Sequence, residues 1–129
     1  MIEPLSQYLE EKYKQHYCYP EVNDGWNKLI IDMYSELEPY FEKELIIEQV
    51  KSKFGGLRVY FTFADVEGID NDENYEQVMA IVSKYEKLAQ STCEYCGSMD
   101  NISTKSVKYW ISTQCANCYE ITKAKLDGK

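Results

Sequence analysis

Four cysteines near the end of the chain have the spacing of a metal site. Cys93 and Cys96 form one C-x-x-C pair, and Cys115 and Cys118 form a second pair after 18 intervening residues. This arrangement is typical of tetrahedral zinc, because two such turns bring four thiolates onto one ion without distorting the backbone. Four protein ligands leave no open position for water, so we expect structural Zn²⁺ and not a catalytic ion.

Other uses of these cysteines remain open. A tetrathiolate site also suits iron, and Cys96-Gly97 resembles the knuckle of rubredoxin-type iron sites. Two disulfides would require an oxidising compartment, whereas the acidic opening of the chain predicts no export signal. A redox dithiol would need only one C-x-x-C pair and would leave the other unexplained. We therefore expect zinc first, iron second, and a reducing cytoplasm as the location.

The segments around the cysteines have the pattern of a known group of zinc fingers. Gly97 permits a tight turn after the first pair, and residues 107–113 are rich in β-formers and predict a strand. Asn117 and Glu120 have the spacing of a capping box, which predicts a helix from Asn117 onward. A knuckle, a hairpin and a ligand-bearing helix resemble a treble-clef or zinc-ribbon-like module, a fold group that hosts many functions.

The rest of the chain predicts an α+β fold. Apolar residues at helical spacing predict helices over 4–17, over 26–38 with Asp24 as N-cap, and over 75–90. Pro39 is expected to end or kink the second helix. We expect residues 1–92 to form an acidic α+β domain and 93–129 a zinc-binding module packed on it, or the two to form one continuous domain.

Residues 45–63 predict a β-hairpin. If Gly55-Gly56 is a two-residue turn, Phe54 faces Leu57 and the apolar side chains share one face. The opposite face then gathers cations and an aromatic ring in an otherwise acidic half, and it is a candidate surface for a phosphate or an acidic partner. Its candidate binding residues are Lys51, Lys53, Arg58 and Tyr60.

The charge of the chain limits its partners. The net charge is −8, and residues 1–92 hold 9 basic against 18 acidic residues. Such a chain is not expected to condense on DNA, because that binding depends on neutralising phosphates. An acidic loop over 64–74 is a second candidate surface, suited to a basic partner. Its residues are Asp65, Glu67, Asp70, Asp72 and Glu73.

One block of the sequence resembles a family. Gly25-Trp26-x-x-Leu29, the segment K-F-G-G-L-R-x-Y over 53–60, and the two C-x-x-C pairs are similar to a widespread set of small bacteriophage and prophage proteins. The resemblance runs from Trp26 to Cys118. It implies a phage origin and action in the cytoplasm of an infected bacterium, and it brings no catalytic residues.

These patterns favour protein interaction over catalysis. The single histidine, His16, has no nucleophile or carboxylate partner in the pattern, and Cys93-Glu94 lacks the spacing of zinc deaminases, so we expect no enzyme. No apolar run predicts a membrane span. We expect a partner that is a host or phage protein. The alternative is a zinc-ribbon nucleic-acid-binding protein with a basic aromatic surface. That surface would comprise Lys105, Lys108, Tyr109, Trp110, Lys123 and Lys125.

Overall fold

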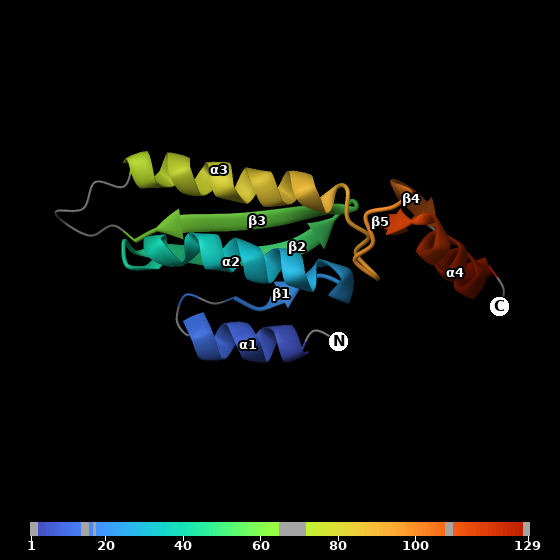
Figure 1. Cartoon of the computed structure of the whole chain (residues 1–129), viewed down its shortest axis with the longest axis horizontal. Helices are drawn as coiled ribbons and strands as arrows, with labels where there is room; N and C mark the ends of the chain where they lie inside the picture. The colour runs from blue at the N-terminus through green and yellow to red at the C-terminus, as the bar shows by residue number, and fades with distance from the viewer. Residues whose placement is uncertain (1–2, 14–15, 17, 65–71, 108–109, 128–129) are drawn as a thin grey trace.

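The computed structural model describes residues 3–13, 16, 18–64, 72–107 and 110–127, and it is an α+β protein as predicted (Figure 1). The described elements follow one another as α1 (Glu3–Tyr13), β1 (Pro20–Glu21), the short 3₁₀ helix η2 (Asp24–Trp26), α2 (Asn27–Phe41), β2 (Leu45–Lys53), β3 (Gly56–Phe63), α3 (Asp72–Ala89), β4 (Ile102–Val107), β5 (Trp110–Cys115) and α4 (Ala116–Asp127). Among these described helices, none combines the length and the apolar character that a membrane crossing requires.

The core lies between α2, α3 and the hairpin of β2 and β3. The apolar stripe expected on the second helix is buried, and the apolar sides of both hairpin strands and of α3 pack with it. The N-cap expected for this helix is wrong, and of the two effects expected of Pro39, ending or kinking the helix, the first is wrong. Asp24 is not an N-cap, because residues 24–26 form a 3₁₀ turn and α2 begins at Asn27. Pro39 does not end the helix, which continues to Phe41.

The hairpin has a different turn from the one predicted. Lys53 pairs with Gly56 and Ser52 with Leu57, so the central turn residues are Phe54 and Gly55 and not Gly55 and Gly56. Both have positive φ, +54° and +80°, as a type I′ turn requires. The predicted pairing is displaced by two positions. Because side chains alternate with a period of two, the paired strand residues keep their predicted faces. Phe54, expected opposite Leu57 on the apolar face, instead lies in the turn and is exposed.

The sheet has a third strand that the sequence did not predict. Pro20 and Glu21 form β1, which pairs in parallel with β2 at Val50 and Lys51. At the opposite edge, the backbone N–H of Val59 in β3 donates to a carboxylate oxygen of Glu86 on α3 at 3.0 Å. One edge of the hairpin is therefore paired, and the other has a backbone donor satisfied by a helix side chain.

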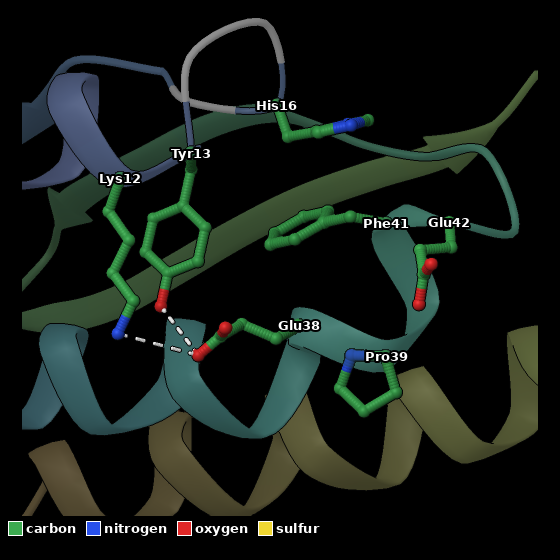
Figure 2. A pocket seen from close by; sticks show the side chains of 7 residues that line it. All are labelled: Lys12, Tyr13, His16, Glu38, Pro39, Phe41 and Glu42. Carbon is green, nitrogen blue, oxygen red and sulfur yellow. Dashed lines mark hydrogen bonds and ion pairs between the residues drawn. The ribbon is translucent and has the colours of Figure 1, made fainter.

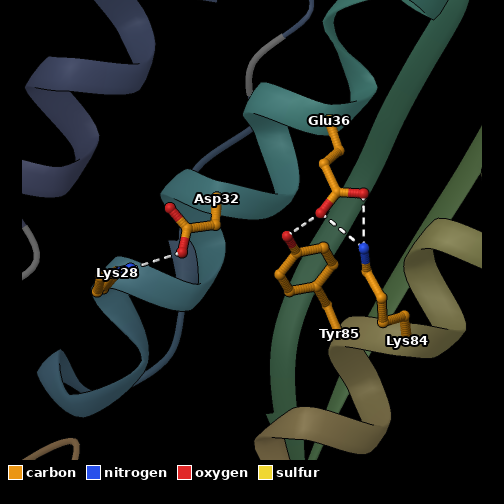
Figure 3. A network of polar contacts seen from close by, with 5 residues as sticks. All are labelled: Lys28, Asp32, Glu36, Lys84 and Tyr85. Atoms are coloured by element: carbon orange, nitrogen blue, oxygen red, sulfur yellow. Dashed lines mark hydrogen bonds and ion pairs between the residues drawn. The ribbon is translucent and has the colours of Figure 1, made fainter.

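Helices α2 and α3 are joined by a polar contact on their exposed sides (Figure 3). Lys84 on α3 donates to both carboxylate oxygens of Glu36 on α2 at 2.7 Å, and the hydroxyl of Tyr85 donates to one of them. These contacts hold the pKa of Glu36 below its usual value. A second pair, Lys28 and Asp32, stays within α2.

The cysteine-bearing segment lies beyond the turn of the hairpin, at the end of the molecule opposite the start of α3 (Figure 1). It consists of the turn at Cys93–Cys96, the antiparallel pair β4 and β5, and α4. The hydroxyl of Thr113 in β5 donates to the carbonyl oxygen of Gly55 at the hairpin tip. The indole N–H of Trp26 donates to the carbonyl oxygen of Thr92 at 2.9 Å. The hairpin tip and η2 therefore both contact this segment.

Candidate metal centre and basic face

The four predicted cysteines converge on one point. Their sulfur atoms all lie within 4.8 Å of one another, and the Sγ atoms of Cys96 and Cys115 are 3.7 Å apart. A tetrahedron with Zn–S bonds of about 2.3 Å has edges of about 3.8 Å, so the observed spacing fits a tetrathiolate ion. Cys93 and Cys115 are buried, whereas Cys96 is exposed and Cys118 half-buried. The cluster is positioned to hold a metal ion near the surface.

Two local structures aim the sulfurs at this point. Gly97 has φ of +82°, and its N–H donates to the carbonyl oxygen of Cys93 at 2.9 Å, which closes the knuckle. The second pair lies at the start of α4, where the N–H of Cys118 donates to the sulfur of Cys115 at 3.4 Å. The helix begins at Ala116, so the capping box predicted from Asn117 is wrong, and a ligand sulfur takes the capping position.

The thiols of Cys93 and Cys118 differ in how readily they ionise. Burial would raise the pKa of the Cys93 thiol, but hydrogen bonds from the backbone of Cys115, Cys96 and Tyr95 outweigh burial and lower this pKa to about 7. Burial raises the pKa of Cys118, and the neighbouring sulfurs raise it further. Protons must therefore leave the cluster when a metal ion binds.

Glu94, between the first two cysteines, is the site residue that the sequence did not predict. It is only 1% exposed. Its carboxylate accepts from the side-chain amide of Asn23 at 3.1 Å and from the backbone N–H of Thr113 at 3.2 Å. Its carbonyl oxygen accepts from the N–H of Gly25 at 2.9 Å. Burial raises the pKa of Glu94. A glutamate inside a C-x-x-C turn is ordinarily exposed, so its type and position gave no signal of this role.

The predicted basic face is present on the solvent side of the hairpin. We use this name for Lys51, Lys53, Arg58 and Tyr60. Lys51 and Arg58 are directly opposite each other on β2 and β3. The ammonium of Lys51 lies 5.8 Å from the centre of the Tyr60 ring, and Tyr60 is 44% exposed. Arg58 and Lys53 are exposed and Lys51 is half-buried.

Among the described residues, the cations of the basic face form no ion pair. Ion pairs in the described part of the chain use Lys12, Lys28 and Lys84, and none uses Lys51, Lys53 or Arg58. The acidic side chain nearest in the sheet pairing, Glu21 of β1, instead accepts from Gln49 at 3.5 Å. The three cations of the basic face thus lie outside the ion pairs of the described residues, in a chain of net charge −8.

The structure describes only part of each of the other two candidate surfaces, the acidic loop and the nucleic-acid surface. Asp72 and Glu73, expected in a loop, form the first turn of α3, where carboxylates favour the positive end of the helix dipole. The remaining acidic candidates, Asp65, Glu67 and Asp70, lie outside the described residues. Most of the alternative nucleic-acid surface likewise lies outside the described residues. This holds for Lys108 and Tyr109 and for the side chains of Lys105, Trp110 and Lys125. The ammonium of Lys123 lies 6.0 Å from the centre of the Tyr119 ring.

The single histidine lines a separate cavity of about 520 Å³ (Figure 2). Its ring stacks on Phe41 with centroids 4.8 Å apart, and its Nδ1 is 3.2 Å from the carbonyl oxygen of Leu45. In the same cavity the hydroxyl of Tyr13 donates to Glu38 at 3.2 Å, and burial raises the pKa of Tyr13 to about 12. His16, Tyr13 and Glu38 are each thus engaged by a neighbour, and His16 and Glu38 form no contact with each other among these interactions.

The fold and the site define a class: an α+β protein with a four-cysteine centre positioned to hold a metal ion and a basic face on its hairpin. Comparisons with protein-family models, with curated proteins and with solved structures give no match.

Proposed function

We propose that this chain is a non-catalytic interaction protein whose basic face binds an acidic surface on another protein. The observation that carries the proposal is a group of three cations beside an exposed tyrosine that form no ion pair with any described residue, in a chain whose net charge is −8. Like charges directly opposite each other on two strands, such as Lys51 and Arg58, destabilise a hairpin. An acidic partner would remove this repulsion, which gives the arrangement a physical reason.

The metal centre has a structural role in this proposal. The ion is Zn²⁺, and residues 93–127 form a treble-clef module. The 3.7 Å sulfur spacing and the order of knuckle, hairpin and helix support this assignment. Iron would fit the same ligands, and metal analysis of the purified protein distinguishes the two ions.

The partner is a host or phage protein in the cytoplasm of an infected bacterium. The resemblance of the K-F-G-G-L-R-x-Y block to phage and prophage proteins supports this setting. A protein partner is favoured over nucleic acid by the net charge of −8, which repels phosphates at long range.

The experiment compares two variants of equal charge change. Lys51→Gln with Arg58→Gln removes two cations from the basic face, whereas Lys28→Gln with Lys43→Gln removes two exposed cations from elsewhere. Each tagged protein is incubated with bacterial lysate, with and without nuclease. After nuclease treatment, we expect the wild type and the Lys28→Gln/Lys43→Gln control to retain a bound protein from the lysate. The Lys51→Gln/Arg58→Gln variant should not retain it. Loss of every retained species after nuclease would contradict a protein partner.

A further inference from the structure

Phe54 occupies a turn position that is unfavourable for an aromatic residue, both in its backbone conformation and in its exposure to solvent. Its φ is +54°, a region that bulky residues rarely adopt, and it is the first central residue of the hairpin turn. Type I′ turns favour Asn, Asp or Gly at this position. Its side chain is 67% exposed and belongs to none of the packed apolar clusters of the described residues. The fold alone therefore gives no reason for a phenylalanine here.

The turn that carries Phe54 is held rigidly. The carbonyl oxygen of Gly55 accepts from the hydroxyl of Thr113, and a Cβ atom at Gly55 would lie only 2.8 Å from a methyl group of Thr104. The hairpin tip is thus packed against β4 and β5. A side chain on a rigid tip loses little conformational entropy when a partner contacts it, which favours its use in binding.

The surroundings of Phe54 define the chemistry of a matching surface. The ammonium of Lys53 lies 5.6 Å from the ring centre, and the ring borders a hollow of about 550 Å³ that Arg58, Thr104 and Glu86 also line. The carboxylate of Glu86 accepts from the backbone N–H of Val59 at 3.0 Å. Neither Lys53 nor Arg58 has an acidic partner in the described chain. An exposed aromatic ring flanked by free cations complements an apolar pocket bordered by carboxylates.

We infer that Phe54 is the anchor of the contact, inserting into an apolar pocket of an acidic partner protein while the basic face pairs with the carboxylates at the rim of that pocket. The inference rests on the proposed function, in which the partner is an acidic protein. It goes further by naming Phe54 as the residue that contributes most to the affinity. Aromatic anchors at the centre of an interface commonly carry most of the binding energy.

The test separates binding from folding. Phe54→Asn creates Asn-Gly, the sequence that type I′ turns favour, so the melting temperature should be unchanged or higher. A random peptide library is first selected for binding to the wild-type protein. The probe is the enriched peptide, synthesised with a fluorescein label. We expect an enriched peptide with aspartate or glutamate around a large apolar residue. Its Kd, measured by fluorescence anisotropy, should be at least about tenfold weaker for Phe54→Asn.

Controls separate failure of the inference from failure of the proposed function. Tyr8→Gln removes an exposed aromatic ring from α1 and should leave the Kd unchanged. Phe54→Asn could bind the peptide as tightly as wild type while Lys51→Gln with Arg58→Gln binds it weakly. In that case Phe54 is not the anchor, and the proposal that the basic face binds an acidic partner is supported. If no enriched peptide binds, or if short single-stranded oligo-dT binds more tightly than every peptide, the proposed function and the inference both fail.

Discussion

Glu94 shows how one residue connects the metal centre to the rest of the fold. Its side chain contacts Asn23 and Thr113, and its carbonyl oxygen contacts Gly25, so three separate segments meet at one amino acid. The contact at Gly25 is so close that a Cβ atom there would lie 2.2 Å from the carbonyl oxygen of Cys93. The position of the first ligand pair is therefore determined by hydrogen bonds as well as by any ion.

We expect Glu94→Ala to destabilise the protein strongly. The change leaves a buried backbone donor at Thr113 and the amide of Asn23 without their acceptor, which costs about 2–4 kcal/mol of unfolding free energy. Glu94→Gln keeps the shape and one acceptor oxygen and should cost less. Urea unfolding of the metal-loaded protein measures both values. Equal stability of wild type and Glu94→Ala would contradict the role assigned to this residue.

The two neighbouring glycines of the hairpin should respond differently to substitution. Gly55→Ala introduces a Cβ atom at φ of +80° and 2.8 Å from a methyl group of Thr104, and we expect a loss of about 1–3 kcal/mol. Gly56→Ala is the matched control, since its Cβ would meet no atom closer than 3.7 Å and its φ is not positive. Thermal unfolding of the pair tests the turn, and a larger effect at Gly56 would disprove the observed register.

At the scale of elements, the contact between α2 and α3 depends on pH. The neighbours Lys84 and Tyr85 lower the pKa of Glu36 relative to the unfolded chain, so this carboxylate stabilises the fold above its unfolded pKa of about 4.3. That contribution is lost as the pH falls through the lower, folded value. Because the Glu36 and Lys84 side chains are 38% and 56% exposed, it is modest, about 0.5–1 kcal/mol.

We therefore expect Glu36→Gln to lower the melting temperature at pH 7 and to differ progressively less from wild type as the pH falls below about 4. Asp32→Asn is the control, because its pair with Lys28 lies within one helix and Lys28 is 88% exposed. Its effect should be smaller at pH 7. A difference between Glu36→Gln and wild type that persists unchanged in acid would show that the pairing is not electrostatic.

The sequence predicted the elements better than their junctions. The stripe of apolar residues predicted α2, and the spacing of the cysteines predicted that four sulfurs meet, because both depend on local periodicity or on known ligand geometry. The turn residues were wrong because Gly-Gly is locally the better turn, whereas packing of Gly55 against β4 and β5 selects Phe54-Gly55. The two-residue strand β1 had no local signal, since its pairing depends on β2.

At the scale of the molecule, the metal should stabilise more than the segment that binds it. The hairpin tip, η2 and the cysteine-bearing segment are hydrogen-bonded to one another, through Thr113 to Gly55 and through Trp26 to Thr92. The hairpin tip in turn carries Phe54 and adjoins the basic face. Removal of the ion is therefore expected to loosen the binding surface as well as the ligands.

We expect Cys96→Ser to lower the metal content and to remove hydrogen-exchange protection over residues 93–127 and at the hairpin tip, while α2 and α3 retain theirs. Metal affinity should also fall as the pH falls, because the thiols must release protons to bind. Metal analysis and hydrogen exchange measure these effects. Freshly purified, reduced protein containing neither zinc nor iron would contradict the metal centre itself.

The contacts of η2 have a consequence for the order of events during synthesis. Asn23 is hydrogen-bonded to a residue 71 positions later, and Trp26 to one 66 positions later. While a ribosome is still translating the hairpin and α3, these early residues have no partners to contact. The first part of the chain must therefore remain incomplete until residues 92–94 have emerged. A cell that makes this protein therefore completes its early segments only once the first ligand turn has been made, and it assembles the full set of metal ligands later still, after Cys118.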